Sequence, residues 1–224
     1  MKKYSVIIAC HNEQASIARV IDGVKQFVPD AEIIAVDDGS QDGTAGVLAR
    51  LEGIRTVTLP VNGGKGVALR KGIEQARGDV LVFIDGDGQD DPADLQRMIQ
   101  ENEKGHRFVN GSKFIGAIED GGISRPNYWG NRFMSGLINL FFGSTVTDSQ
   151  SGFRVIDKQV VSPWRITATQ YEIETEMLCK ALKAKVEIFE VPVTRKARTG
   201  GRTGFRRVRN GMRILFTILR ERLT

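Results

Sequence analysis

The chain contains few of the residues on which disulfide-rich and metal-cluster proteins depend. Only two of its 224 residues are cysteine and two are histidine, so they supply neither a dense disulfide framework nor a Cys/His metal cluster. Cys10 and Cys179 stand far apart in the sequence. Isolated cysteines of this kind are typical of small buried side chains in a protein that works in a reducing cytosol.

Long apolar runs are also absent, because charged or polar residues interrupt every hydrophobic segment before the roughly 20 residues that a membrane-spanning helix needs. We expect no signal peptide before the first apolar segment, and we find no repeat or linker further along. With 41% hydrophobic and 26% charged residues, the composition is that of a globular protein. We therefore expect a single domain over residues 1–224, without a transmembrane helix.

The most informative segment is Val80–Gln89, with the sequence V-L-V-F-I-D-G-D-G-Q. Its apolar half, Val80–Ile84, is typical of a buried strand in a parallel sheet. Asp85, Asp87 and Gln89 follow at alternate positions, so their side chains point the same way if the segment is extended. Oxygen ligands at the carboxyl end of such a strand predict a site for Mg²⁺ or Mn²⁺, although a solvated acidic turn has the same pattern.

Two other apolar segments also end in polar residues. Tyr4–Cys10 runs into His11-Asn12-Glu13, and Glu32–Val36 runs into Asp37-Asp38-Gly39-Ser40. The carboxyl ends of parallel strands meet at one edge of a sheet, so we expect these residues to line a cleft there. Its carboxylates would accept hydrogen bonds from ribose hydroxyls and base N–H groups, while one of residues 37–42 also suits a helix N-cap.

Strands and helices alternate through the first half of the chain. The apolar runs predict strands at about 4–10, 32–37, 54–59, 80–85 and 107–112, with helices at about 14–27, 42–51, 65–76 and 92–104. In the second half we expect a loop at 114–125, helices at 126–142, 172–183 and 204–222, and strands near 151–156 and 185–191. This order is typical of an α/β fold with a mostly parallel sheet flanked by helices.

Seven short motifs follow one another over nearly the whole chain: Ser5–Glu13, Val36–Ser40, Asn62–Gly66, Asp85–Gln89, Asn110–Lys113, Thr147–Arg154 and Arg198–Thr203. Together they resemble the inverting glycosyltransferases of family 2, which have the GT-A nucleotide-diphospho-sugar transferase fold. The resemblance is specific to the polyprenyl-phosphate sugar transferases typified by dolichyl-phosphate mannose synthase. Four positions depart from the family pattern and bear on nucleotide and acceptor rather than on reaction class: Ala9, His11, Lys113 and Gly204.

The resemblance implies a nucleotide-diphosphate sugar donor, of the GDP-mannose or UDP-glucose type, and Mg²⁺ or Mn²⁺ as cofactor. The metal ligands would be Asp85, Asp87 and Gln89, and the implied catalytic residues are Asp87, Lys113 and Arg202. The residues implied to bind the nucleotide sugar are Ala9, His11, Glu13, Val36, Asp38, Lys65, Asp85, Gly86, Asp87, Gln89 and Arg202. A cation at the start of a helix is unfavourable for the helix dipole, which also indicates an anionic partner for Lys65.

The acceptor implied by the resemblance is a polyprenyl phosphate. Its phosphate would be bound by Lys113, Arg132, Ser151, Arg154 and Arg198. A phosphate monoester is largely ionised at neutral pH, because its second pKa is near ~6, and it needs no general base. A sugar hydroxyl acceptor would need one, for which Asp148 and Glu174 are the candidates. Arg154 could equally pair with a carboxylate such as Asp148.

The end of the chain is basic and amphipathic. Apolar residues follow helical spacing at Phe205, Val208, Met212, Leu215, Phe216, Leu219 and Leu223, and arginines occupy the other faces. Such a helix is typical of an interfacial membrane anchor, and an ordinary helix packed on the domain fits equally well. Segment 126–142 is a second candidate for lipid contact. We expect a cytoplasmic protein bound peripherally to the inner face of the membrane.

Other classes of function fit the sequence less well. The net charge of +5 and the arginine-rich end favour a nucleic-acid-binding protein, but acidic strand ends would repel a phosphate backbone. A silent binding module would be expected to have a broken metal motif. A nucleotidyltransferase would want a glycine-rich basic loop where the chain has His11-Asn12-Glu13. We therefore expect hexose transfer to a polyprenyl phosphate, with transfer to a saccharide hydroxyl as the alternative and the oligomeric state left open.

Overall fold

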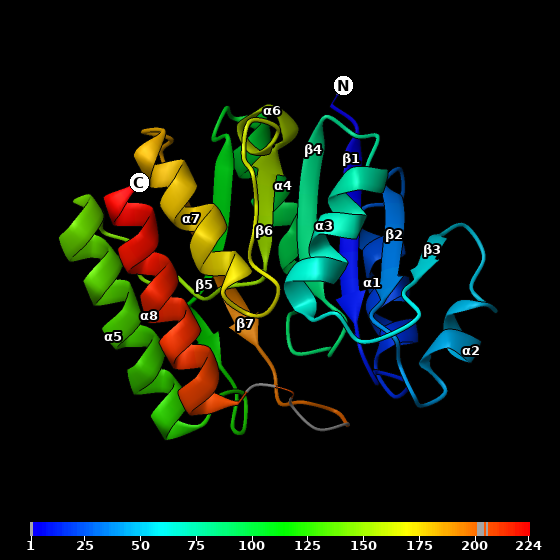
Figure 1. Cartoon of the computed structure of the whole chain (residues 1–224). Coiled ribbons are helices and arrows are strands. Elements are labelled where there is room, and N and C mark those ends of the chain that lie inside the picture. The colour runs from blue at the N-terminus through cyan, green and yellow to red at the C-terminus, as the bar shows by residue number, and fades with distance from the viewer. Residues whose placement is uncertain (1, 201–203, 205) are drawn as a thin grey trace.

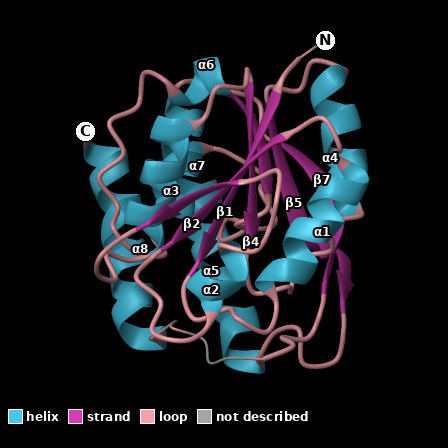
Figure 2. Ribbon diagram, turned by 90° about the vertical axis from the view of Figure 1, so that its right-hand side faces the viewer, coloured by secondary structure: helices cyan, strands magenta, loops and turns pink. Residues whose placement is uncertain are grey.

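The computed structural model describes residues 2–200, 204 and 206–224. In that part of the chain, seven strands form one sheet between two layers of helices (Figures 1 and 2). The strands are β1 (Tyr4–Cys10), β2 (Glu32–Asp37), β3 (Arg55–Thr58), β4 (Val80–Asp85), β5 (Phe108–Ile118), β6 (Arg154–Asp157) and β7 (Phe189–Arg195). The helices are α1 (Ile17–Phe27), α2 (Thr44–Leu48), α3 (Lys65–Gln75), α4 (Asp94–Glu103), α5 (Arg125–Phe142), α6 (Lys158–Val161), α7 (Ile173–Lys183) and α8 (Arg207–Leu223).

The sheet is mostly parallel, as the sequence predicts. Its order is β3-β2-β1-β4-β6-β5-β7, and the first four strands of this order run parallel to one another. β6 is antiparallel to both of its neighbours, β4 and β5, whereas β5 and β7 are parallel. Chain connections diverge on either side of β1, which lies between β2 and β4, and α/β sheets place their ligands at such a switch point.

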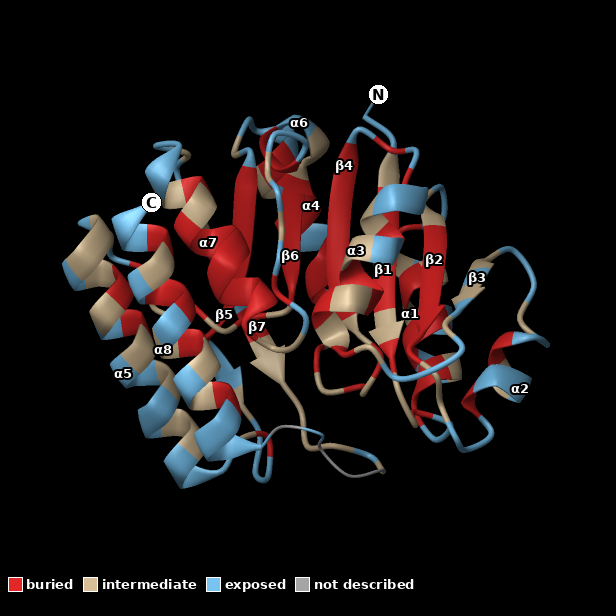
Figure 3. Ribbon diagram, in the orientation of Figure 1, coloured by how far each residue is buried: buried red, intermediate tan, exposed pale blue. Residues whose placement is uncertain are grey.

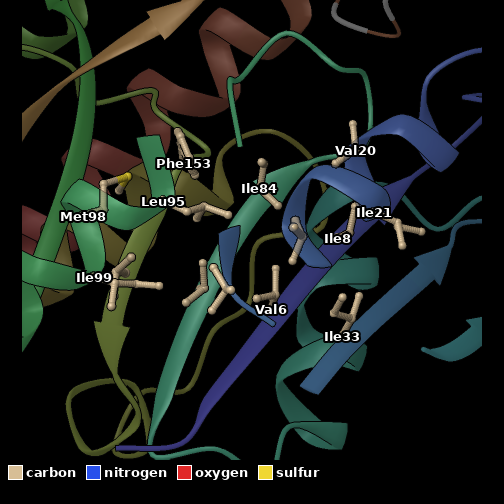
Figure 4. Close-up of a cluster of buried hydrophobic side chains, with 14 of the residues drawn as sticks. Val6, Ile8, Val20, Ile21, Ile33, Ile84, Leu95, Met98, Ile99 and Phe153 are labelled. Atoms are coloured by element: carbon tan, nitrogen blue, oxygen red, sulfur yellow. The ribbon is translucent and has the colours of Figure 1, made fainter. Parts of the chain in front are cut away.

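Both faces of the central strands are buried, which explains their continuous apolar sequences. On one face, alternate residues of β1 pack against α1 and α4 in the cluster drawn in Figure 4, which includes Val6, Ile8, Val20, Ile21, Leu95 and Met98. On the other face, Ile7 belongs to a second cluster with residues of α3 and α7, such as Leu69 and Leu178. Figure 3 shows the resulting buried layer through β1, β2 and β4.

α5 and α8 lie side by side beyond the β5–β7 edge, and both contact α7 (Figure 1). α8 buries one face, including Ile214 and Ile218, which are 3% and 0% exposed. The helix is therefore packed on the domain, as one of the two sequence interpretations expected. Its opposite face is exposed. Within the described residues, no helix combines the length and the apolar character required to cross a bilayer.

The second half of the chain contains the errors of the sequence prediction. The loop expected at 114–125 is wrong in its first part, because β5 continues to Ile118. Past a register shift between Ser112 and Ala117, β5 pairs again with β7, which runs over Phe189–Arg195 instead of 185–191. The short helix α6 was not predicted. β7 is the edge strand and alternates buried with more exposed residues, and β5 is exposed over most of its last five residues, so hydropathy does not mark where either strand ends.

The contact between α3 and β1 provides a test of the packing. A Cβ at Gly72 of α3 would overlap the Cγ2 methyl of Ile7 on β1, whereas a Cβ at Gly46 of α2 has no neighbour within 4 Å. We expect Gly72→Ala to lower the free energy of unfolding by about 1–3 kcal/mol, because overpacking outweighs the better helix propensity of alanine. Gly46→Ala should raise it slightly. Urea unfolding that ranks the two variants the other way would contradict this packing.

Candidate active site

A cleft of about 970 Å³ opens at the carboxyl ends of β1 and β4, the lower edge of the sheet in Figure 1. One wall consists of residues at strand ends, among them His11, Asp38 and Asp85. The other wall comes from α5, from the segment before α7 and from the start of α8. The sequence prediction of a cleft lined by strand-end carboxylates is confirmed in its location.

The buried ammonium group of Lys65 joins three segments of the chain. Its Nζ lies 2.6 Å from Oδ1 of Asp85, at the end of β4, and 2.6 Å from Oε1 of Glu174 on α7. Burial alone would raise the pKa of Asp85, but the attraction of Lys65 outweighs burial and the pKa is lowered. For Glu174, burial prevails and the pKa is raised. Lys65 thus keeps Asp85 ionised inside the cleft.

A glycine makes room for this ion pair. A Cβ at Gly152 would lie 2.9 Å from Nζ of Lys65 and 3.0 Å from both carboxylate oxygens of Asp85. Any larger side chain there would separate the pair. Gly152 follows Ser151 in the Thr147–Arg154 motif, so the Lys65–Asp85 contact explains a glycine at this place in it.

Arg198 links the carboxylates of two strand-end segments. Its guanidinium donates to Oδ2 of Asp87 at 3.1 Å and, through a short contact, to Oε1 of Glu13. Burial raises the pKa of Glu13 to about 7, although Arg198 acts in the opposite direction. The segment that follows β7 is thereby held against the acidic motif.

Arg195, at the end of β7, organises the residues that follow Asp87. It donates to Oδ1 of Asp90 at 2.8 Å and to Oε1 of Gln89 at 2.9 Å. The amide nitrogen of Gln89 donates to the carbonyls of Gly122 and Lys196. All polar atoms of the Gln89 side chain are therefore engaged by other groups, so its use as a metal ligand stays a prediction that requires the amide to turn.

The remaining donor set suits a hard divalent cation. Asp85 and Asp87 present carboxylates to the cleft, and three cations, Lys65, Arg195 and Arg198, are already attracted to them. Mg²⁺ is commonly held by one or two carboxylates, with water and substrate phosphates as its other ligands. Among the described residues, no three His, Cys, Asp or Glu side chains are arranged to hold a metal ion. The two aspartates fit such an ion as partial ligands.

The end of the cleft next to β2 is organised by Asp38. Its carboxylate accepts hydrogen bonds from the backbone N–H groups of Gly63 at 2.7 Å and of Gly64 at 2.8 Å. The backbone carbonyl oxygen of Asp38 lies 2.9 Å from Nδ1 of His11. Gly64 has a φ of 98°, which favours glycine, and its backbone packs against the Thr169 carbonyl. Asp38 therefore positions the glycine loop that places Lys65 in the site.

Twelve of the residues predicted from the sequence line the cleft: Ala9, His11, Glu13, Asp38, Lys65, Asp85, Gly86, Asp87, Gln89, Lys113, Ser151 and Arg198. Val36 does not, because its side chain is fully buried in the core beside α3. Arg132 is exposed on α5, with its guanidinium carbon 5.7 Å from the centre of the Phe114 ring. Arg202, and also Phe205 of the predicted amphipathic helix, lie outside the described residues.

Arg154 is misplaced in the sequence prediction. It is 1% exposed, and its guanidinium donates to Oδ1 of Asn110 and to the carbonyls of Ser149 and Glu174. Burial lowers its pKa to about 10. Arg154 thus connects β5, β6 and α7 inside the protein, and it is not placed to bind an acceptor phosphate. The alternative prediction, an ion pair between Arg154 and Asp148, is not found among the described residues either.

Asp148 pairs with Lys113 instead. Oδ2 of Asp148, which is 1% exposed, lies 2.6 Å from Nζ of Lys113. Both candidate bases for a hydroxyl acceptor are thus paired with a lysine, Asp148 with Lys113 and Glu174 with Lys65. Oε2 of Glu174 is buried and accepts no hydrogen bond from the described residues.

Some cleft residues were not predicted from the sequence. Asp90 could have been predicted, because it directly follows the acidic motif in the sequence. It forms an ion pair with Arg195. Four others belong to the start of α8 or precede it, and were interpreted only as the basic faces of an amphipathic helix: Arg206, Arg207, Arg209 and Arg213. Asn210, between them, was not singled out.

Removal of the Lys65 ammonium group should lower the stability of the fold. We expect Lys65→Met to lower the free energy of unfolding by about 3–5 kcal/mol, because Asp85 and Glu174 would lose the cation that compensates them in a buried place. The matched control is Lys71→Met on the same helix, whose pair with Glu74 is 47% and 55% exposed and should change stability by less than about 0.5 kcal/mol. Urea unfolding with equal effects for both lysines would contradict the role assigned to Lys65.

Comparison with known proteins relates the chain to enzymes. The model of Glycosyl transferase family 2 matches residues 5–163. The UDP-N-acetylglucosamine–dolichyl-phosphate N-acetylglucosaminyltransferase of Methanococcus voltae is 31% identical over 211 residues, which cover 84% of this chain and 83% of that protein. The dolichol-phosphate mannosyltransferase of Pyrococcus furiosus is 30% identical over 207 residues, which cover 89% of this chain and 58% of that protein.

Solved structures show the same fold. The glucosyl-3-phosphoglycerate synthase of Mycobacterium tuberculosis, in complex with Mn²⁺, uridine diphosphate and phosphoglyceric acid, superposes with a TM-score of 0.78. It is 22% identical, and the match covers 99% of this chain and 78% of that one. Several relatives are much longer than the part that matches, since the chain spans 48% and 32% of two Haloferax volcanii proteins, the hexosyltransferase Agl6 and the glycosyltransferase AglD.

Proposed function

Because the chain belongs to Glycosyl transferase family 2, we propose that it transfers a hexose from a nucleotide-diphosphate sugar to a polyprenyl phosphate, with inversion at the sugar and with help from a divalent metal. Membership confirms the family resemblance, the fold class and the enzyme class predicted from the motifs. The observation that carries the proposal is the pair Asp85 and Asp87, held at a strand end in the cleft beside three cations.

The donor end is supported by the chemistry of the strand ends. Asp38 and His11 lie where they can contact a nucleoside, and Asp85 and Asp87 would hold Mg²⁺ or Mn²⁺. The metal would neutralise the charge that develops on the departing diphosphate. One relative is named for a UDP-sugar donor, and the matching solved structure contains uridine diphosphate and Mn²⁺.

Arg198 supplies a second positive group for the diphosphate. It already forms ion pairs with Glu13 and Asp87, so it lies beside the place where the leaving diphosphate would be. Arginine binds phosphate oxygens well through its planar array of N–H donors. On donor binding, we expect Arg198 to exchange a carboxylate partner for the diphosphate.

The acceptor is inferred from the state of the candidate bases. A saccharide hydroxyl needs a general base, but Asp148 and Glu174 each face a lysine at 2.6 Å. A phosphate monoester needs none, because it is already ionised. Two relatives are also named for a dolichyl or dolichol phosphate acceptor. These observations favour a polyprenyl phosphate.

A hydroxyl acceptor is the second candidate. The buried Oε2 of Glu174, without a hydrogen-bond donor among the described residues, is the single observation that favours it. Release of Glu174 from Lys65 would be required before it could take a proton. Transfer to a simple saccharide with no lipid phosphate present would support this second reaction.

We also propose that the protein binds the membrane surface through α5 and α8. Eight large apolar side chains on these two helices are between 41% and 85% exposed: Trp129, Phe133, Leu140, Val208, Met212, Phe216, Leu219 and Leu223. Figure 3 colours much of the outer faces of both helices as exposed. Apolar residues flanked by arginines match an anionic bilayer, which binds both kinds of side chain.

The metal assignment can be tested with one carboxylate. We expect Asp87→Asn to reduce transfer on the order of 100-fold or more, because one ligand of the charge-stabilising cation is lost. Its melting temperature should stay near that of the wild type, and chelation with EDTA should abolish wild-type transfer. Asp91→Asn is the control, since Asp91 pairs with Lys196 and does not line the cleft. Full activity of Asp87→Asn would refute the assignment.

Membrane binding can be tested by co-sedimentation with anionic vesicles. We expect Met212→Ser combined with Phe216→Ser to weaken binding by about tenfold or more, because two exposed apolar side chains no longer insert. Val61→Ser is the control, because Val61 is 71% exposed but lies in the loop before α3. If all three substitutions leave binding unchanged, the two-helix face is not the membrane contact.

A further inference from the structure

The start of α8 forms a second positive region of the cleft, away from the acidic strand ends. Arg206, Arg207, Arg209 and Arg213 all line it. Positions 206, 209 and 213 are three and four residues apart, so on a helix they share a face. α8 is 17 residues long and directs the positive end of its dipole to the same region.

The charge of these arginines is poorly compensated. Arg207 donates to the neutral side-chain oxygen of Asn127 at 3.1 Å, and Arg213 reaches Glu172 only at 3.5 Å. In the part of the chain that the structure describes, Arg206 and Arg209 form no ion pair. Arg220, further along α8, is different, because it pairs with Glu176 at 3.0 Å and Glu221 at 2.9 Å. Surplus positive charge is therefore concentrated at the cleft end of the helix.

A side-chain amide on the wall of the cleft is available to a ligand at the same place. Asn210 lies one residue after Arg209, lines the cleft and is only 5% exposed. Its side chain makes no hydrogen bond with any described residue. The donors and the acceptor of this amide are therefore free on the wall of the cleft, where they can hydrogen-bond to a polar group bound there.

The adjoining face of α8 is apolar. Val208, Met212 and Phe216 are 81%, 61% and 68% exposed and follow one another every four residues. Each lies next to an arginine of the cleft in the sequence or one helical turn away. α5, which contacts α8, exposes Trp129 and Phe133. The mouth of the cleft thus presents cations on its inner side and hydrocarbon contacts on its outer side, which matches a ligand with an anionic head and an apolar tail.

We propose that the start of α8 is the entry subsite for the acceptor, with Arg206, Arg209, Arg213 and Asn210 binding its phosphate and Met212 and Phe216 contacting its prenyl chain. The inference rests on the proposed function and deepens it. It assigns phosphate capture to α8 instead of the buried Arg154. The acidic residues that would attract a metal and the donor lie on the strand-end wall, so the two phosphate groups approach from different sides.

The direct test is calorimetric titration of the full chain with geranyl phosphate, a soluble probe that has both a phosphate and a short prenyl tail. We expect Arg209→Gln and Arg213→Gln each to weaken binding by about tenfold, because each removes a charged hydrogen-bond donor. The control is Arg222→Gln, an exposed arginine at the far end of the same helix, which should bind geranyl phosphate like the wild type. Unchanged binding in the two cleft variants would overturn the subsite.

Two further probes separate the parts of the proposal. Binding of 3-phosphoglycerate should be weaker than that of geranyl phosphate but equally sensitive to Arg209→Gln, whereas geraniol should be insensitive to it. Equal affinity for both phosphates would overturn the prenyl contact. A loss in Arg222→Gln as large as in the cleft variants would show general electrostatic attraction and overturn the subsite.

Transfer assays keep this inference apart from the proposed function. If the wild type transfers sugar to geranyl phosphate while Arg209→Gln shows an unchanged acceptor KM, the function stands and the subsite fails. If the wild type binds geranyl phosphate through α8 but transfers no sugar to it from any GDP- or UDP-sugar, the subsite stands and the proposed reaction fails. The expected result is a tenfold higher acceptor KM in Arg209→Gln with an unchanged donor KM.

Discussion

The buried ammonium of Lys65 is the interaction on which the site depends. It neutralises Asp85 at the end of β4 and Glu174 on α7, two carboxylates that could not otherwise remain ionised so close together in a buried place. The glycine loop before α3 places this lysine, Asp38 holds the loop, and Gly152 leaves room for the pair. Lys65 thereby joins α3, the end of β4 and α7.

The two regions of the cleft differ in how far their charges are compensated within the protein. Asp85, Asp87 and Asp90 are each compensated by a lysine or arginine, whereas the arginines at the start of α8 have little compensation. A divalent cation suits the first region, and a phosphate suits the second. Because donor and metal bring opposite charges together, their binding to the first region alters the net charge little, and Arg198 can change partners at low electrostatic cost.

The sequence predicted the parts of the molecule that depend on short-range pattern. Strands β1, β2 and β4 are buried on both faces, so their apolar runs and the polar residues after them were recognisable. β5 and β7 were misjudged because β7 is the edge strand and the second half of β5 is largely exposed, so hydropathy does not mark their ends. Arg154 was wrong because its burial depends on acceptor groups from separate segments. The arginines of α8 were seen, but only the packed helix shows which of them face the cleft.

The reversed strand β6 divides the sheet into two parts of different origin in the chain. On one side, β1 to β4 come from the first 85 residues and carry the acidic strand ends of the cleft. On the other side, β5 and β7 come from later in the chain and lie nearer to α5 and α8. The two parts share no strand pairing except through β6. Changes in the later part can therefore leave the register of β1 to β4 intact, so the fold permits the proposed acceptor side to diverge while the proposed nucleotide side is kept.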